Sequence, residues 1–357
     1  MRRKSKGLNH SGGALKIIYS NKHKLHVPTH QLFSDGLHTA VEVPDRAECI
    51  LHVLQERKVG EIVAPDVFGM DVLKTVHDEG LLDFLSGVYD EWEASGRATD
   101  VGLIPHTFAM RSLESKPEEL IRQAGYYCFE TQTPILRGTW EAAQQAACCA
   151  LTGADLLLAG ESSAYALCRP PGHHAGRDLY GGYCYLNNAA LAAQRLSEHG
   201  RVAILDVDYH HGNGTQAIFY DSADVLFASI HADPNLEYPY YSGYASERGR
   251  GNGVGYTLNL PLSFGCTDDL YLATLNQALE RLVDFNADFW VVSLGVDLCK
   301  DDPLCRFDVS RNVFAQVGRM VGAQKKVTLF VQEGGYNLNV VGNCVADVLE
   351  GFIGMCD

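Results

Sequence analysis

Two carboxylates and an imidazole alternate along the chain at Asp206, Asp208 and His210. If the backbone there is extended, the three side chains project to the same side. Such a group needs a balancing positive charge in a dry site, and zinc, which accepts Asp oxygen and His nitrogen, supplies it. We therefore predict a metal site held by Asp208, His210 and, from the end of another strand, Asp297. The alternative is a surface Asp pair with a capping His, which Gly212-Asn-Gly214 disfavours because glycines allow tight backbone around a site.

A tandem pair, His173-His174, follows Pro170-Pro-Gly172, a rigid turn that fixes the direction of both imidazoles. The simpler interpretation is a solvated pair or two core histidines. The functional interpretation needs partners that set each tautomer, and Asp206 and Asn213 are available for that role. A carboxylate partner favours imidazolium more than a neutral amide does, so the two histidines would differ in pKa. One would act as a base and the other as an electrostatic element.

A phenol follows a flexible glycine pair in the run Glu333-Gly-Gly-Tyr336. Its hydroxyl can donate a hydrogen bond to an oxygen that becomes negative during attack on a carbonyl. A tyrosine after a glycine turn is more often a packing residue, so this motif gains weight only from its place at the end of a strand. Together with the metal site and the histidines, it predicts a metal-assisted acyl hydrolase.

The segments that must position these residues alternate between short apolar runs and longer helical patterns. Apolar strands with intervening helices predict an α/β protein with a mostly parallel sheet covered on both faces. No Pro/Gly/Ser linker interrupts the alternation, which favours one domain. The predicted strands are 16–19, 61–64, 164–168, 202–207, 225–230, 256–260, 289–295 and 327–332. The predicted helices are 44–57, 79–96, 139–153, 185–199, 268–286, 308–323 and 340–353.

The chemical motifs follow four of these strands, at 164–168, 202–207, 289–295 and 327–332. Ligands of open α/β sheets bind beyond the carboxyl ends of the strands, so we expect the motifs to converge on one rim. The stretch 98–138 breaks the alternation with mixed polar and aromatic residues. It predicts a long ordered insertion or an active-site loop.

The 357 residues are 46% hydrophobic and 20% charged, which is typical of a soluble globular protein with a large core. A net charge of −15 disfavours nucleic acid and anionic membranes as partners and leaves a cationic partner open. No apolar run is long enough to span a membrane, and the basic start of the chain lacks the apolar core of a secretory signal. We expect residues 1–14 to form a flexible tail. The 11 cysteines contain no C-x-x-C pair, so we expect free thiols and a cytoplasmic location.

Several motifs, taken in order, resemble the zinc-dependent histone deacetylase superfamily, which has the arginase-deacetylase fold. They are Cys168-Arg-Pro-Pro-Gly-His-His-Ala175, Gly181-Gly-Tyr-Cys-Tyr-Leu-Asn-Asn188, Asp206-Val-Asp-Tyr-His-His-Gly-Asn-Gly-Thr-Gln216, Ser293-Leu-Gly-Val-Asp297 and Glu333-Gly-Gly-Tyr-Asn337. Further runs look like the bacterial acetylpolyamine amidohydrolases, namely Ile18-Tyr-Ser with His23, Gly125-Tyr-Tyr127 and Gly138-Thr-Trp-Glu-Ala142. The resemblance covers roughly residues 15–355 and implies a single deacetylase domain over 15–357, with 98–138 as an inserted loop.

The resemblance also implies a role for each residue of the predicted rim. Asp208, His210 and Asp297 would be the zinc ligands, and Tyr336 would be the oxyanion donor. His174 would be the general base, with His173 as its general-acid or electrostatic neighbour, and Asp206 and Asn213 would be the partners of the two histidines. The substrate tunnel would be lined by Gly182, Tyr183, Tyr241 and Arg46. Fe²⁺ or Co²⁺ would substitute for zinc. A structural potassium ion is expected near the backbone of Asp206, Asp208 and His210 and near Ser229.

The likeness to acetylpolyamine amidohydrolases implies a cationic N-acetylated amine as substrate and a homodimer. Acidic residues of an inserted loop bind the amine in those relatives, and the candidates here are Asp90, Glu91, Glu93 and Asp100, for which a solvated helix face is an equally good explanation. Leu304 stands where the vertebrate polyamine deacetylase has a selective Glu, so that device is absent. The segment Leu298-Cys299-Lys300 departs from the family pattern beside the tunnel, which leaves the substrate less well defined than the reaction.

Other functions fit the same residues less well. The main alternative is a protein acetyl-lysine deacetylase of the bacterial class II-like branch. A catalytically inactive module that binds acylated amines is disfavoured because every catalytic residue is present. A binuclear manganese ureohydrolase would carry D-x-H-x-D rather than D-x-D-x-H, and a serine hydrolase would carry a G-x-S-x-G elbow.

Overall fold

Eight parallel strands form the central sheet of the computed structural model, which describes residues 14–110 and 115–356. Their order across the sheet is β4-β1-β5-β10-β9-β6-β7-β8, and every neighbouring pair is parallel. The predicted strands are confirmed, and the sheet is entirely rather than mostly parallel. The strands are β1 Lys16–Ile18, β4 Glu61–Val63, β5 Ser163–Ala166, β6 Val202–Asp206, β7 Val225–Ala232, β8 Thr257–Leu262, β9 Phe289–Leu294 and β10 Val327–Gln332. The tail predicted at 1–14 lies outside the described residues except for residue 14.

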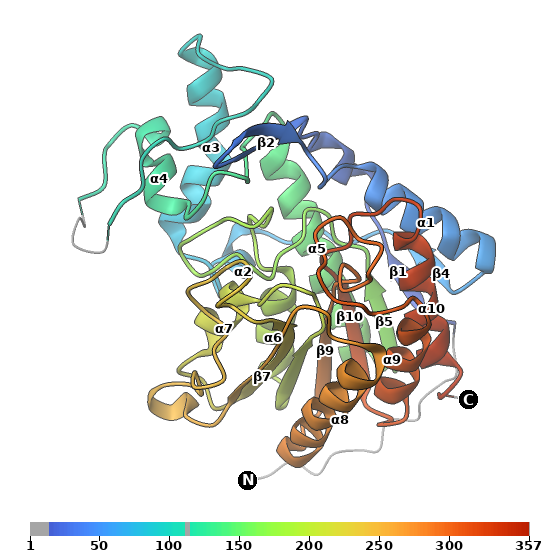
Figure 1. Ribbon diagram of the computed structural model, residues 1–357. Helices are drawn as coiled ribbons and strands as arrows, with labels where there is room; N and C mark the ends of the chain where they lie inside the picture. Colours follow the sequence, from blue (N-terminus) through green and yellow to red (C-terminus); the bar gives the residue numbers. More distant parts are fainter. Residues whose placement is uncertain (1–13, 111–114, 357) are drawn as a thin grey trace.

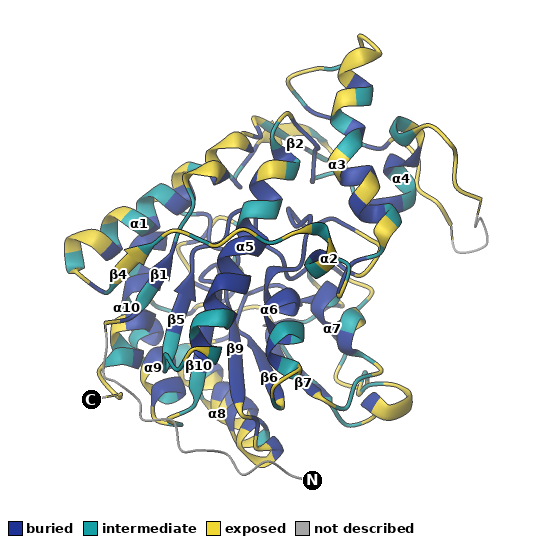
Figure 2. Ribbon diagram, turned by 180° about the vertical axis from the view of Figure 1, so that it is seen from behind, coloured by how far each residue is buried: buried dark blue, intermediate teal, exposed yellow. Residues whose placement is uncertain are grey.

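Helices cover both faces of this sheet, as the sequence predicts (Figure 1). Leu205 and Val292 point into a core with α1, α8, α9 and α10, whereas their neighbours Ile204 and Val291 point into a core with α3, α5 and α6. This alternation along β6 and β9 is the period of a strand buried on both sides. Figure 2 shows β6 and β9 in dark blue, the colour of buried residues. The long helices are α1 Asp45–Arg57, α3 Glu79–Ala94, α5 Thr139–Leu158, α6 Asn188–Ser197, α8 Asp268–Phe285, α9 Asn312–Gly322 and α10 Val341–Ile353.

The alanine-rich helix α5 packs closely on the sheet because its side chains are small. A Cβ atom added at Gly153 would lie 2.4 Å from a methyl group of Leu329 in β10. The adjacent thiols Cys148 and Cys149 are buried in this helix and free, as expected for small apolar side chains. Among the described residues, no helix is both long and apolar enough to cross a lipid bilayer.

Several short elements were not predicted, because a single turn or a four-residue strand has too little periodicity to be recognised. Asn187 shows how one boundary is set, since its side chain accepts a hydrogen bond from the Ala190 N–H and starts α6 three residues later than predicted. The unpredicted elements are the hairpin β2 His30–Phe33 and β3 Gly36–Thr39, the helices α2 Met70–Leu73, α4 Ala124–Tyr127 and α7 Asn213–Phe219, and the 3₁₀ turns η1 Asn21–Leu25, η2 Leu120–Gln123 and η3 Gly251–Gly253.

The described part of the stretch 98–138 is mostly irregular. Its regular structure is η2 and α4, with an isolated bridge between Leu103 and Ile135 and another from Cys128 to Tyr180. It lies beside α3 at one end of the molecule, away from α10 (Figure 1). That this stretch is an insertion stays a prediction.

Candidate active site

The chemical motifs meet where neighbouring strands end. The strands β5, β10, β9 and β6 lie side by side in that order, and their parallel pairing puts their carboxyl ends at one edge. Asp206 is the last residue of β6 and lies opposite Ser293 of β9, with Asp208 and Asp297 in the loops that follow. The convergence on one rim that the sequence predicts is therefore present.

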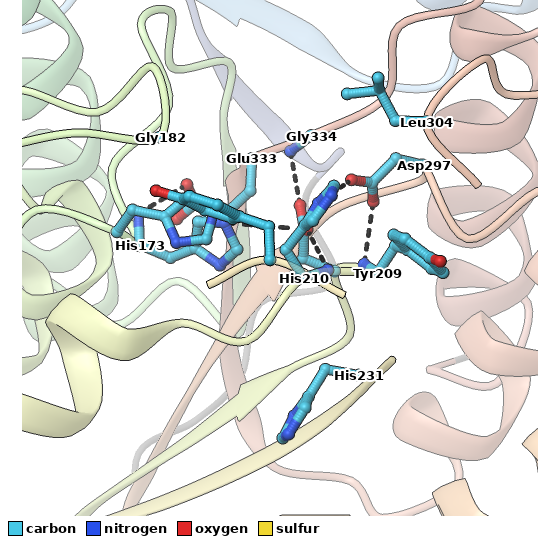
Figure 3. A network of polar contacts seen from close by, with 12 residues as sticks. His173, Gly182, Tyr209, His210, His231, Asp297, Leu304, Glu333 and Gly334 are labelled. Carbon is cyan, nitrogen blue, oxygen red and sulfur yellow. Dashed lines mark hydrogen bonds and ion pairs between the residues drawn. The ribbon is translucent and has the colours of Figure 1, made fainter. Parts of the chain in front are cut away.

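Asp208, His210 and Asp297 form a buried cluster in which one ligand atom from each residue lies within 4.8 Å of the others. The Nδ1 atom of His210 is 3.0 Å from an oxygen of Asp297 and 3.4 Å from an oxygen of Asp208. Backbone N–H groups of Gly334 and Tyr209 donate to the two carboxylates at 2.8 and 3.0 Å and hold their orientation (Figure 3).

The cluster fits a divalent metal ion. Burial and the neighbouring Asp208 raise the pKa of Asp297 to about 7, as expected where two buried carboxylates lie close together, and a cation bound between them would offset this repulsion. Carboxylate oxygen and imidazole nitrogen are both zinc ligands, and three protein ligands are the number found in catalytic zinc sites. Close packing confines the space, since a Cβ atom at Gly334 would lie 2.5 Å from Asp297 and 2.6 Å from Asp208.

The two histidines of the Pro-Pro-Gly turn have different partners. The Nδ1 atom of His173 lies 3.0 Å from Asp206, and the Nδ1 atom of His174 lies 2.7 Å from the amide oxygen of Asn213. Burial lowers the pKa of His174, and the positive charge of His173 lowers it further. Burial opposes protonation of His173 as well, but Asp208 and Asp206 outweigh it and raise the pKa to about 10. The structure thus pairs each histidine with the residue that the resemblance implies.

The turn that carries the histidines is itself anchored by a buried acid. One oxygen of Glu333 accepts hydrogen bonds from the N–H groups of Gly172 and His173 at 2.6 and 3.0 Å. Glu333 follows β10 directly, so the end of one strand orients the loop after its neighbour β5. The sequence analysis identified Glu333 only as part of the tyrosine motif.

Tyr336 is held by contacts to its backbone and to its ring. Asp302 accepts a hydrogen bond from the Tyr336 N–H at 2.6 Å, and the guanidinium carbon of Arg46 lies 4.6 Å from the ring centroid. Arg46 also donates to the carbonyl oxygens of Gly335 and Glu333, so it fixes the loop behind the phenol. Burial raises the pKa of Tyr336 well above its ordinary value, which keeps the hydroxyl protonated as a donor.

A pocket of about 330 Å³ opens above these groups. Its lining residues are Phe33, Ser34, Thr131, Gln132, His174, Gly182, Tyr183, His210, Glu237, Tyr238, Tyr240, Leu304 and Tyr336. Gly182 and Tyr183 lie where the resemblance implies. Tyr241 does not line the pocket as predicted, since its side chain is 93% exposed and it is absent from the lining. Tyr238 lines the pocket instead, with its ring centroid 5.0 Å from that of His174. Arg46 is buried behind Tyr336 and does not line this pocket.

The four acids predicted to bind an amine lie outside the lining of this pocket. Glu91 accepts hydrogen bonds from the backbone N–H groups of Leu120 and Ile121, and Glu93 pairs with Arg137. Asp90 and Asp100 do not line the pocket either. Their assignment to the substrate stays a prediction, and Glu237 is the carboxylate that the described pocket contains.

The pocket wall at Gly182 and Tyr183 is hydrogen-bonded to the stretch 98–138. Thr133 accepts a hydrogen bond from the Tyr183 N–H at 2.8 Å, and Glu130 accepts one from the Gly182 N–H at 3.1 Å. A side chain could not replace the hydrogen at Gly182, since a Cβ atom would lie 2.3 Å from the ring of His174.

Comparison with known proteins identifies the family. Residues 40–352 match the model of the histone deacetylase domain. The chain belongs to the histone deacetylase family. Its relatives in this family include acetylpolyamine amidohydrolase 1 of Pseudomonas aeruginosa, which is 45% identical over 342 residues, or 94% of this chain and 98% of that protein. The acetylpolyamine amidohydrolase of Mycoplana ramosa is 43% identical over 95% of this chain and 100% of its own length.

A solved structure of the histone deacetylase family supports the fold. The acetylpolyamine aminohydrolase from Burkholderia pseudomallei superposes with a TM-score of 0.87 and 37% identity, and the match covers 95% of this chain and 98% of that one. The resemblance inferred from the sequence motifs is therefore confirmed, as is the α/β fold.

Sequence reasoning missed the residues that support this histone deacetylase site. Asp302, Glu130, Thr133 and Glu237 act through hydrogen bonds to distant loops, and a single acid or hydroxyl in a loop carries no pattern of its own. Tyr238 was missed because the prediction named Tyr241, three positions later in the same loop, as the residue that lines the tunnel. The Asp-Pro dipeptide at 302–303 was the one available signal, because it marks a turn.

Proposed function

We propose that this chain is a zinc-dependent amidohydrolase that removes the acetyl group from N-acetylated polyamines such as N-acetylputrescine and N-acetylcadaverine. Hydrolysis breaks the amide C–N bond and releases acetate and the free amine. The names of relatives at 43–45% identity over nearly the whole chain support this substrate class. The observation that carries the reaction is the position of His174, which is hydrogen-bonded to Asn213 and lines the pocket together with His210 of the metal cluster.

Asp208, His210 and Asp297 would hold the metal ion. When bound, a divalent ion such as zinc supplies Lewis acidity, which lowers the pKa of water and polarises an amide carbonyl. The same donor set accepts Fe²⁺ or Co²⁺. We expect one metal ion per chain.

The two histidines divide the proton transfers. Because Asn213 offers an amide oxygen to Nδ1 of His174, that nitrogen carries the hydrogen and Nε2 has a free lone pair. Nε2 therefore takes the proton of the attacking water and passes it to the leaving amine nitrogen. The carboxylate of Asp206 favours the protonated form of its partner His173, and a positive charge there favours negative charge developing nearby.

Tyr336 stabilises the oxygen that becomes negative when water adds to the acetyl carbon. Its protonated hydroxyl donates a hydrogen bond to that oxygen, and Asp302 and Arg46 hold the loop in place before the substrate arrives. Preorganisation of this kind is what lets a hydrogen bond favour the transition state over the bound substrate.

The test is a panel of substrates given to the zinc-loaded enzyme. N-acetylputrescine, N-acetylcadaverine and N-acetylspermidine are compared with an acetyl-lysine peptide, and the free amine is measured. We expect the highest kcat/KM with an acetylpolyamine. A wide preference for the peptide would instead support the alternative function, a protein acetyl-lysine deacetylase.

Three further features belong to the same proposal. Ser229 lies opposite Asp206 across β6 and β7 and is fully buried, which supports a structural potassium ion near the backbone of these strands. Exposed apolar side chains at Phe108 and Met110 support a homodimer through the stretch 98–138. The buried free thiols, such as Cys148 and Cys149, support a cytoplasmic location.

A further inference from the structure

The active-site pocket has aromatic walls and one acidic side chain. Five of its lining residues carry aromatic rings, namely Phe33, Tyr183, Tyr238, Tyr240 and Tyr336. Glu237, in the loop after β7, is the one carboxylate among the lining residues, and the described lining contains neither lysine nor arginine. Aromatic faces attract cations, and a carboxylate among them adds a full negative charge.

Glu237 is held in one position from two sides. The Tyr209 hydroxyl donates to its Oε2 atom at 3.0 Å, and the Tyr238 N–H donates to its Oε1 atom at 3.0 Å. Tyr209 is itself fully buried, with its ring 4.9 Å from that of His210, so the carboxylate is fixed relative to the metal cluster. Figure 3 shows Tyr209 beside Asp297 and His210.

No cation within the described residues neutralises this carboxylate. Within the described residues, the hydrogen-bond donors to the Glu237 side chain are the neutral Tyr209 hydroxyl and the Tyr238 backbone N–H, and none of the ion pairs of residues 14–110 and 115–356 includes Glu237. Glu42, a buried acid behind the site, has by contrast Arg46 and Arg169 as cationic partners. A half-buried carboxylate held by neutral donors keeps its affinity for an external cation.

We propose that Glu237 binds the distal ammonium group of the substrate and so selects a cationic amine. The inference rests on the proposed function, because the acetyl group must reach His174 and Tyr336 while the other end of the molecule reaches Glu237. An ammonium group at this place forms a charge-assisted hydrogen bond to the carboxylate and contacts the aromatic walls. The selecting acid then comes from the loop after β7 rather than from the predicted set in 90–100.

The experiment compares two substrates of equal length on the zinc-loaded enzyme, N-acetylcadaverine and the neutral N-(5-hydroxypentyl)acetamide. Glu237→Gln removes the charge and keeps one of the two acceptor oxygens, which can still accept a hydrogen bond from Tyr209. We expect it to lower kcat/KM for N-acetylcadaverine by about 10- to 100-fold, mainly through KM, and to leave the neutral amide within about threefold. Glu280→Gln, which makes the same change in net charge on an exposed residue of α8, is the matched control.

A loss shared equally by both substrates would overturn the inference, because it would show that Glu237 acts on the metal site through Tyr209. Tyr209→Phe measures that route directly, since it removes the hydroxyl and keeps the carboxylate. An unchanged preference in Glu237→Gln would also overturn it.

Binding of the product separates this inference from the proposed function. Cadaverine is titrated into the zinc-loaded wild-type and Glu237→Gln proteins by calorimetry, which needs no turnover. Weaker binding to the variant supports the role of Glu237 even if neither amide is hydrolysed, an outcome that would refute the proposed function alone. Equal binding of cadaverine to both proteins would overturn the inference.

Discussion

The floor of the active-site pocket is made by strand ends, whereas its mouth is made by loops from several parts of the chain. At the floor, Asp208 and Asp297 are almost fully buried and receive backbone hydrogen bonds from the ends of neighbouring strands. At the mouth, Tyr240 is 48% exposed, Ser34 is exposed and Gln132 is half-buried. The parallel sheet thus fixes the reacting groups, and the loops decide what reaches them. Changes at the floor should affect the reaction, and changes at the mouth should affect the choice of substrate.

The largest effect is expected from loss of a metal ligand at the floor. Asp297→Ala removes one of three donors, so we expect the protein to lose bound metal and its turnover to fall to background. Metal content by mass spectrometry and acetate release check both. Asp221→Ala, which changes an exposed acid paired with Arg250, should retain the metal and the activity. Full activity of Asp297→Ala would show that this cluster is not the catalytic metal site.

Loss of the phenol hydroxyl should be the next largest effect. Tyr336→Phe keeps the ring on Arg46 but removes the donor, so kcat should fall by about 10²- to 10³-fold while the metal stays bound. Single-turnover kinetics with N-acetylcadaverine measure the chemical step. A change confined to KM would show that the Tyr336 hydroxyl takes no part in the chemical step.

Stability should respond to a buried cluster behind the floor. Burial would raise the pKa of Glu42, but Arg169 and Arg46 outweigh it and lower the pKa to about 2. Since the folded-state pKa is depressed, the stabilisation is complete above the unfolded-state value and is lost as the pH falls from about 4.5 towards about 2.

Glu42→Gln tests this account, because it leaves the buried guanidinium groups without their anion. We expect it to lower the free energy of unfolding at pH 7 by about 3–5 kcal/mol, and to flatten the acid limb of the stability curve. Denaturant unfolding between pH 3 and pH 7 measures both. An acid limb identical to that of the wild type would assign the pH dependence to other groups.

A smaller effect is expected at the wall of the mouth. Thr133→Val removes the acceptor for the Tyr183 N–H, so KM should rise by about three- to tenfold with kcat within about twofold. Thr75→Val, at an exposed position two residues after the end of α2 and outside the pocket lining, is the control. A fall in kcat with unchanged KM would mean that this wall also orients the catalytic groups.

The smallest effect is expected at Tyr241, which is exposed and outside the pocket lining. Tyr241→Ala should leave kcat and KM within about twofold, the range of a surface substitution. Tyr238→Ala should reduce kcat/KM much more, because it removes the ring that packs on His174. The reverse order would restore Tyr241 as a residue of the tunnel.

The same contrast between floor and mouth explains what could be predicted from the sequence. Strands buried on both faces are continuous apolar runs, so the positions of Asp208 and Asp297 followed from where those runs end. The mouth has no such pattern, since the direction of Glu237 depends on its hydrogen bond to Tyr209, 28 positions away. For the same reason the sequence favoured Tyr241 over Tyr238 as a tunnel residue, since the bend of the loop that carries both is set by tertiary contacts. The supporting acids Glu333 and Asp302 bond to residues more than 30 positions away, which a local reading cannot detect.

His174 offers the most direct test of the central claim, which is that a neutral histidine above one metal ion drives hydrolysis of an N-acetylated polyamine. The measurement is release of acetate and cadaverine from N-acetylcadaverine by wild-type and His174→Ala proteins loaded with equal amounts of zinc. The wild type should release one acetate for each cadaverine with about one zinc per chain. His174→Ala should bind the same zinc and turn over about 10²- to 10⁴-fold more slowly. Wild-type turnover by His174→Ala, or a requirement for two metal ions per chain, would contradict the account.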